Sequence, residues 1–296
     1  MKSGFVSLIG RPNAGKSTLL NTIIGKKIAI TSNTVQTTRN IIQGIYTTDD
    51  LQIVFVDTPG IHKPQYKLGK ILNDQAYYSM EDVDLILFLI DATQKIGSGD
   101  KFIIEKLKAV KTPVILLLNK IDKIRYEELL PIINEYKDLY PFNEIIPISA
   151  TKKTNITDLI KTISNYLPND IKYYDDDTIT NISKKFTIAE LIREKVLYKT
   201  HKEVPHSVTC IVEHLEEDKK RVSIGASIIV DRENLKKILI GHQGKMIKAI
   251  GSEARIDIEN LLEKKVYLDL RIKVVNNWRD KDHFLNQELN LKDFNE

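Results

Sequence analysis

The stretch Gly10-Arg11-Pro12-Asn13-Ala14-Gly15-Lys16-Ser17 decides how the first half of this sequence is interpreted. It satisfies the phosphate-loop pattern and follows an apolar run, Phe5 to Ile9, just before a helix-like segment, which is the context that the pattern requires. Glycines allow backbone N–H groups to curl around phosphate oxygens, and the start of a helix adds favourable partial charge. We therefore expect Lys16 to reach the β- and γ-phosphates of a nucleotide and Ser17 to offer its hydroxyl to magnesium.

Three further motifs follow in order, each directly after an apolar run. Asp57-Thr58-Pro59-Gly60 supplies a carboxylate for a magnesium-bound water and a glycine whose N–H can turn towards a γ-phosphate. Asn119-Lys120-Ile121-Asp122 ends in a carboxylate that can accept both the N1 and N2 hydrogens of guanine, which predicts a preference for GTP over ATP. Ser149-Ala150-Thr151-Lys152 is placed for a backbone N–H to meet guanine O6. The predicted nucleotide-binding residues are Gly10, Arg11, Pro12, Asn13, Ala14, Gly15, Lys16, Ser17, Thr18, Asp57, Thr58, Pro59, Gly60, Asn119, Lys120, Asp122, Ser149, Ala150 and Thr151.

Short apolar runs alternate with helix-length segments through residues 1–172, and this alternation predicts a mostly parallel sheet covered by helices on both faces. Two runs, 85–90 and 114–118, are apolar throughout, as expected of central strands that are buried on both sides. This half is therefore predicted to be an α/β domain of the P-loop type. The predicted strands are Phe5 to Ile9, Ile53 to Val56, Leu85 to Ile90, Val114 to Leu118 and Ile145 to Ile148.

The pattern changes after Tyr173 to Asn181, a stretch with three consecutive aspartates. We place a linker and a first helix at 173–200, a separate α+β domain at 201–280 and an acidic tail at 281–296. The predicted order is helix, strand, strand, helix, helix, strand. These elements are Phe186 to Tyr198, Ser207 to His214, Arg221 to Val230, Arg232 to Leu239, Lys245 to Leu262 and Val266 to Val275.

Composition is that of an ordinary soluble protein, with 296 residues, 42% hydrophobic and 28% charged. A single cysteine cannot form an internal disulfide, and no run approaches the roughly 18 to 20 apolar residues needed to cross a bilayer. Met1 to Phe5 lacks the charged leader and apolar core of a signal peptide, so we expect a cytosolic location. The net charge of +4 names no partner by itself, but Lys219 to Lys248 holds eight basic and two acidic residues, and such a local cluster suits phosphate binding.

On these four motifs the first half resembles the translation-factor-type GTPases. Within that class, Asn13 and the segment Gln36-Thr37-Thr38-Arg39 resemble the Era family. The resemblance implies that Thr38, which matches the family position better than its neighbour, caps the magnesium in the GTP state. It also implies a potassium ion near Asn13, and the alternative is that this asparagine only stabilises the loop, since asparagine is common in turns. The residues assigned to catalysis are Lys16, Thr38 and Gly60, and those assigned to the metal are Ser17, Thr38 and Asp57.

Hydrolysis is expected to be slow. Ras-like enzymes orient the attacking water with a glutamine just after the glycine that senses the γ-phosphate; that glycine is Gly60 here, and the next residue is Ile61. Isoleucine cannot hydrogen-bond to water, so backbone groups, a distant side chain or a partner must hold it. His62 as a general base and Arg39 as a charge-stabilising arginine are the alternatives, against which we favour a solvent-exposed histidine and a surface or structural arginine.

The segment Ile240-Gly241-His242-Gln243-Gly244-Lys245 lies between two predicted helices, which is the position of the GXXG loop in KH domains. Glycines allow a nucleic-acid backbone to approach closely, and the following helix directs N–H groups at phosphate. The predicted element order is that of a type II KH domain. The alternative is a helix-loop-helix turn in a domain that binds protein. The predicted RNA-binding residues are Gly241, His242, Gln243, Gly244, Lys245 and Lys248.

Together the two halves resemble the Era family across almost the whole chain. The resemblance implies a GTPase that uses GTP/GDP and Mg²⁺, binds 16S ribosomal RNA near its 3′ end, and acts in assembly of the small ribosomal subunit. It also implies peripheral association with the inner membrane. We expect the protein to be a monomer. Two departures are visible: the loop interior His242-Gln243 lacks the basic residue that members often carry, and the acidic tail lacks a Gly-Tyr ending. The rival interpretation is a GTPase whose C-terminal domain docks a protein or membrane partner in cell-cycle control.

Overall fold

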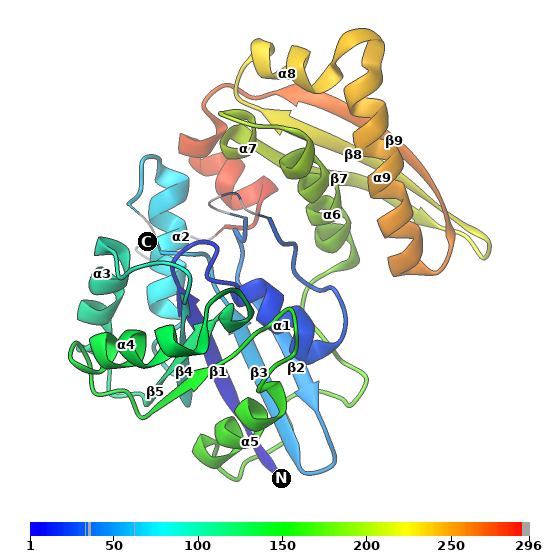
Figure 1. Cartoon of the computed structure of the whole chain (residues 1–296). Helices are drawn as coiled ribbons and strands as arrows, with labels where there is room; N and C mark the ends of the chain where they lie inside the picture. Colours follow the sequence, from blue (N-terminus) through cyan, green and yellow to red (C-terminus); the bar gives the residue numbers. More distant parts are fainter. Residues whose placement is uncertain (33, 35–36, 62, 292–296) are drawn as a thin grey trace. The chain divides into compact units, whose positions relative to one another are not determined.

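The computed structural model describes residues 1–32, 34, 37–61 and 63–291. The chain divides into two compact units, one made of Met1–Gln65 with Gly69–Asn181 and the other of Tyr66–Leu68 with the chain from Ile182 onward. Both units mix helices and strands (Figure 1). Among the described residues, every helix is too short or too polar to cross a bilayer.

The first unit is built on a sheet that, within the described residues, has six strands in the order β2-β3-β1-β4-β5-β6. All neighbouring pairs are parallel except β2 and β3, which are antiparallel. The predicted mostly parallel sheet is confirmed. The strands are β1 (Lys2–Gly10), β2 (Ile42–Thr47), β3 (Leu51–Asp57), β4 (Leu85–Asp91), β5 (Val114–Asn119) and β6 (Glu144–Pro147).

Helices cover both faces of this sheet (Figure 1). One face carries a buried apolar cluster in which Phe88 of β4 and Leu116 of β5 meet side chains of α2, α3 and α4, such as Ile103 and Tyr136. On the opposite face, Leu87 and Leu117 are also fully buried, as predicted for central strands. The helices are α1 (Lys16–Ile24), α2 (Lys67–Tyr78), α3 (Ser98–Leu107), α4 (Tyr126–Lys137) and α5 (Ile156–Tyr166), with a short 3₁₀ turn η1 (Ile121–Lys123).

Strand β2 was not predicted, because its sequence Ile-Gln-Gly-Ile-Tyr-Thr is neither a continuous apolar run nor a strict alternation. Its outer edge is covered by the segment predicted as a linker: Ile45 donates its N–H to the carbonyl of Ile179 at 3.0 Å, and Gly44 pairs with Thr180. The fully buried side chain of Gln52 accepts the N–H groups of residues 173 and 174 at 2.8 and 3.0 Å. Residues 173–181 therefore lie on the sheet edge, which they protect from pairing with another chain.

The second unit packs its helices against a sheet that, as far as the described residues show, has three strands in the order β7-β8-β9, antiparallel and then parallel. The predicted order of helix, two strands, two helices and strand is confirmed, with an added short helix, α7. Trp278, whose place the sequence left open, is fully buried and donates its Nε1–H to the carbonyl of Ser207 at 3.0 Å. The elements are α6 (Lys184–Lys199), α7 (Val204–Ser207), β7 (Val208–Glu217), β8 (Arg221–Val230), α8 (Glu233–Ile240), η2 (His242–Gly244), α9 (Lys245–Leu262), β9 (Lys265–Val274), η3 (Trp278–Asp280) and η4 (Phe284–Glu288).

Candidate nucleotide-binding site and nucleic-acid groove

The predicted phosphate loop connects the end of β1 to the start of α1. Gly15 has φ +104°, and a Cβ atom there would lie 2.1 Å from Nδ2 of Asn119, so only glycine fits. The Lys16 side chain is buried in the loop, where its Nζ donates to the carbonyl oxygens of Gly10 and Arg11 at 3.2 and 3.3 Å. Burial lowers the pKa of Lys16, and the nearby carboxylate of Asp57 partly offsets that shift. The loop thus holds a positive charge inside a ring of backbone groups, which suits a phosphate.

Three oxygen-bearing side chains meet beside the loop. The Ser17 hydroxyl donates to Asp57 Oδ2 at 2.6 Å and lies 2.9 Å from Oγ1 of Thr38, which is only 8% exposed. The other carboxylate oxygen of Asp57 is buried and, within the described part of the chain, has no hydrogen-bond partner. Burial raises the pKa of Asp57 to about 6, against the opposing effects of Lys16, Ser17 and Thr58.

Hard oxygen ligands around an unsatisfied buried carboxylate oxygen fit Mg²⁺. The sequence placed Ser17, Thr38 and Asp57 at the metal, and the fold brings these three together from three separate segments. The bound ion would neutralise charge on the β- and γ-phosphates, while Ser17 and Thr38 would ligate it and Asp57 would hold one of its waters.

Asn119, at the end of β5, links the phosphate loop to the predicted guanine-binding segments. Its side chain is 2% exposed and makes three hydrogen bonds. Nδ2 donates to the carbonyl of Ala14 at 2.8 Å, and Oδ1 accepts the N–H groups of Lys120 at 2.9 Å and Ala150 at 3.1 Å. One amide side chain thereby sets the spacing between the phosphate and base ends of the site.

The remaining guanine-motif side chains are held in the same way. Lys120 donates from Nζ to the carbonyl of Asn13 at 2.8 Å and to Asp91 Oδ2 at 2.6 Å. The Ser149 hydroxyl donates to Asp122 Oδ1 at 2.6 Å, which orients a carboxylate that is exposed and so accessible to a base. The side chain of Asp91, which sequence reasoning missed, holds Lys120 in place; the signal was an acidic residue directly after the apolar run 85–90.

The described residues around Arg39 and Gly60–Ile61, next to the predicted magnesium ligands, are buried or half-buried. Gly60 lies against Pro12 of the phosphate loop, since a Cβ atom at Gly60 would fall 2.8 Å from Pro12 Cα. Ile61 is 3% exposed and packs in the apolar cluster with Ile9, so it turns away from any attacking water. Arg39 is 4% exposed, which favours its structural interpretation. Gln36 and His62 lie outside the described residues.

The predicted GXXG loop joins α8 to α9. Gly241 has φ +69°, and a Cβ atom there would lie 2.7 Å from Cβ of Met246, so a side chain is excluded. Four of the predicted RNA-binding side chains are exposed: His242, Gln243, Lys245 and Lys248.

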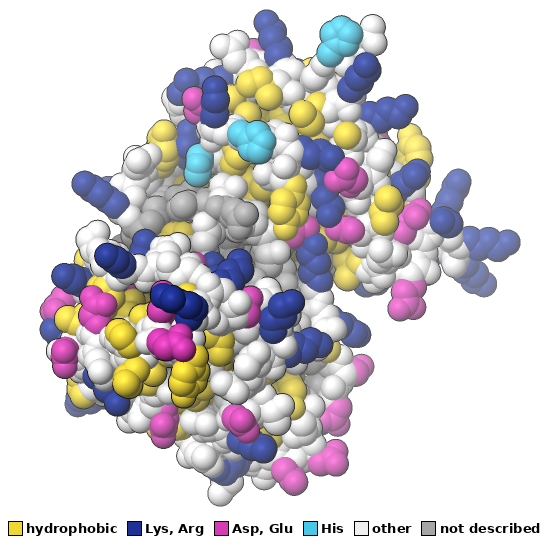
Figure 2. Space-filling model, viewed as in Figure 1, with side chains coloured by type: hydrophobic (Ala, Val, Ile, Leu, Met, Phe, Trp, Pro, Cys, Tyr) yellow, Lys and Arg dark blue, Asp and Glu magenta, His cyan; other side chains and the backbone are white. Residues whose placement is uncertain are grey.

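A groove of about 430 Å³ continues from Lys248 between α9 and β9. Sequence reasoning missed Arg255 and Tyr267 in it, although Lys248, Ser252 and Arg255 have the four-and-three spacing of one helix face. Figure 2 shows Lys and Arg side chains spread among hydrophobic ones over the second unit. The groove is lined by Ile247, Lys248, Gly251, Ser252, Arg255, Val266, Tyr267, Leu268, Asp269 and Leu270.

Each of the two units resembles a known protein family. The family of 50S ribosome-binding GTPases matches residues 5–120, and the KH domain family matches residues 203–279. A crystal structure of Era in complex with MgGDPNP and nucleotides 1506–1542 of 16S ribosomal RNA is 40% identical, covers 97% of this chain and 98% of its own, and gives a TM-score of 0.94. The chain belongs to the Era family. An Aquifex aeolicus Era variant bound to GDP·AlF4⁻ is also 40% identical with the same coverage and a TM-score of 0.93.

Membership of the Era family confirms the predicted fold class, a P-loop GTPase domain followed by a type II KH domain. The chain is therefore a GTPase, as the four motifs predicted. The contacts between individual Era-family side chains and a bound nucleotide or RNA stay predictions.

Proposed function

We propose that this Era-family chain is a GTP-dependent switch that binds 16S ribosomal RNA near its 3′ end through its KH domain and acts in assembly of the small ribosomal subunit. The observation that carries the proposal is the groove between α9 and β9, which begins beside the GXXG loop. The same chain has a phosphate loop and, beside it, the side chains Ser17, Thr38 and Asp57 that suit Mg²⁺. The relative bound to nucleotides 1506–1542 of 16S ribosomal RNA supports the choice of RNA.

The groove has the chemistry that single-stranded RNA needs. Lys248 and Arg255 can meet phosphates along one side of α9, while Ile247 and Leu268 offer apolar surface to bases. Asp269 is the acidic residue of the lining, and Arg271 neutralises it through bonds of 3.1 and 2.7 Å to one carboxylate oxygen. The net charge presented to RNA along the groove is therefore positive.

At the nucleotide site, we propose that Lys16 binds the β- and γ-phosphates, that Ser17, Thr38 and Asp57 hold Mg²⁺, and that Asp122 reads guanine. The hydrogen bonds that hold these side chains support the roles: Lys16 to the phosphate loop, Ser17 to Asp57, and Ser149 to the exposed carboxylate of Asp122. We further propose that the protein is a cytoplasmic monomer, and the family resemblance supports its peripheral association with the inner membrane. Fractionation of cells and sedimentation of the pure protein test these two points.

The rival is a GTPase whose KH unit docks a protein or membrane partner. To separate the two, the protein loaded with GDP or a non-hydrolysable GTP analogue is titrated into fluorescent single-stranded RNA that matches the 3′ end of 16S ribosomal RNA, at fixed salt. A scrambled RNA provides the comparison. We expect tighter binding to the matched RNA, and more so with the GTP analogue.

Three variants test whether the RNA binds in the groove. Arg255→Ala removes a cation from the groove lining, and we expect it to weaken RNA affinity about tenfold and lower the salt dependence. The matched control Lys220→Ala removes an exposed cation on the β7–β8 turn, outside the groove lining, and should change affinity less than twofold. Gly241→Asp should abolish binding, because a side chain there collides with Met246. Undiminished RNA affinity in Gly241→Asp would refute the proposal and favour a protein or membrane partner.

A further inference from the structure

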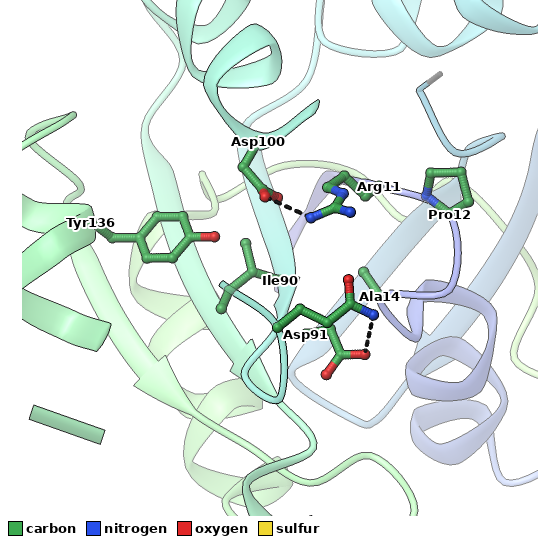
Figure 3. Close-up of a pocket in the computed structure, with 8 residues that line it drawn as sticks. Arg11, Pro12, Ala14, Ile90, Asp91, Asp100 and Tyr136 are labelled. Carbon is green, nitrogen blue, oxygen red and sulfur yellow. Dashed lines mark hydrogen bonds and ion pairs between the residues drawn. The ribbon is translucent and has the colours of Figure 1, made fainter. Parts of the chain in front are cut away.

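We propose that Arg11 is a positioning residue of the nucleotide site: its side chain fastens the phosphate loop to α3 through Asp100, and nucleotide affinity depends on this tether. Arg11 is the first residue after the glycine that opens the phosphate loop, and its guanidinium extends to the N-terminal turn of α3 (Figure 3).

Asp100 is the buried partner of this ion pair, and the start of α3 holds its carboxylate in place. Arg11 Nη1 donates to Asp100 Oδ2 at 2.9 Å, and the Asp100 side chain is 4% exposed while that of Arg11 is 34% exposed. The same carboxylate oxygen accepts the N–H of Gly97 at 2.9 Å. That bond caps the start of α3, so the position of the carboxylate is set by the helix as well as by Arg11.

The local sequence leaves room for the arginine. A Cβ atom at Gly97 would lie 3.1 Å from Arg11 Nη1, and one at Gly99 would lie 3.3 Å from Arg11 Cδ. Both distances are closer than an ordinary packing contact allows, so the two glycines let the arginine stem and guanidinium lie on bare backbone. A chance surface ion pair would not need this clearance at two positions along the arginine side chain.

The tether acts on the part of the loop that faces the phosphates. The carbonyl of Arg11 accepts hydrogen bonds from Lys16 Nζ and from the N–H of Ala14, each at 3.3 Å. The next residue, Pro12, is in contact with Gly60, the predicted sensor of the third phosphate. A shift of the backbone at Arg11 would therefore move both the Lys16 ammonium group and Pro12, which packs against Gly60.

A second contact holds the other side of the loop. Lys120 Nζ donates to the Asn13 carbonyl and to the carboxylate of Asp91. The phosphate loop is therefore held at two points, at Asn13 through Lys120 and Asp91 at the end of β4, and at Arg11 through Asp100 at the start of α3. Figure 3 shows Asp91 and Asp100 on either side of the small cavity behind the loop. Because the contact through Lys120 remains, loss of the Arg11 tether should loosen nucleotide binding without unfolding the domain.

The test is a double-mutant cycle on the full-length protein with Arg11→Met, Asp100→Asn and the combined variant. Methionine keeps most of the apolar stem and removes the guanidinium. We measure the equilibrium affinity and dissociation rate of fluorescent GDP, together with the thermal midpoint in the absence of nucleotide. We expect each single variant to bind GDP about tenfold more weakly through faster dissociation, and the double variant to bind no more weakly than the worse single variant.

Two further variants complete the design. Arg11→Lys should recover most of the affinity, because an ammonium can still pair with Asp100. Lys108→Met breaks a 2.6 Å ion pair with Glu105 on the same helix, and it should leave GDP affinity unchanged. The proposal is overturned if Arg11→Met and Asp100→Asn bind GDP like the parent protein, if they lower only the thermal midpoint, or if their effects on affinity simply add.

Discussion

Asn119 is the side chain on which the geometry of the nucleotide site depends most directly. Asn119→Ala removes three hydrogen bonds at once, to the carbonyl of Ala14 and the N–H groups of Lys120 and Ala150, in a place where the side chain is 2% exposed. Each bond is worth about 1 kcal/mol net, so the free energy of unfolding of the GTPase unit should fall by roughly 3 kcal/mol. Because the phosphate and guanine ends then lose their fixed spacing, we expect GDP affinity to fall at least about tenfold, or roughly 1.4 kcal/mol.

Denaturation in urea separates the two units. The one tryptophan of the chain, Trp278, lies in the second unit, so its fluorescence should report an unchanged transition while circular dichroism reports the weakened GTPase unit. Asn143→Ala is the control for loss of one asparagine hydrogen bond, because the exposed Asn143 side chain accepts the N–H of Val114 at 2.9 Å at the opposite end of β5. It should lower the free energy of unfolding by no more than about 1 kcal/mol and leave GDP affinity intact. The reasoning is refuted if Asn119→Ala is no more damaging than Asn143→Ala in both measurements.

Four other outcomes are expected from the residues of the GTPase unit. The pKa of Asp57, about 6, lies above the usual value of an aspartate, so a proton competes with Mg²⁺ for this carboxylate below pH 6. Magnesium-dependent GDP affinity, measured as a function of pH, should therefore fall about tenfold per pH unit below pH 6 and stay constant above it. A flat profile from pH 5 to 7 would contradict this expectation. Without Mg²⁺ the same raised pKa makes the free energy of unfolding decline as the pH rises from about 4 to 6. Ile61→Gln should lower the thermal midpoint without accelerating GTP turnover, because the side chain packs in the core and an unpaired buried amide costs about 1–3 kcal/mol. Faster GTP turnover in this variant would show that the glutamine side chain reaches the attacking water. Asp122→Asn should shift the preference from GDP to the xanthine nucleotide in competition binding, and undiminished GDP selectivity would defeat the guanine assignment.

Much of the fold could be predicted because the apolar pattern follows burial closely. The runs at 85–90 and 114–118 became β4 and β5 within one residue at either end, since strands covered on both faces must be apolar throughout. The segment Arg221–Val230 became β8 with the predicted ends. Strand β2 escaped prediction because an edge strand need not be apolar, and its pairing with β3 and with residues 179–180 is decided by the rest of the fold.

The sequence by itself determined which chemical groups serve the site: a lysine and a serine hydroxyl at the start of α1, a carboxylate at the end of β3 and an amide at the end of β5. All four lie at the edge of the sheet where parallel strands present their carboxyl ends to a ligand. Only the tertiary structure decided how these groups are held. Asn119 meets Ala14 across more than a hundred residues, Arg11 turns to Asp100 instead of solvent, and Ile61 faces the core. Motif spacing states which residues follow one another along the chain, whereas burial and hydrogen bonding depend on which strands and helices become neighbours in space.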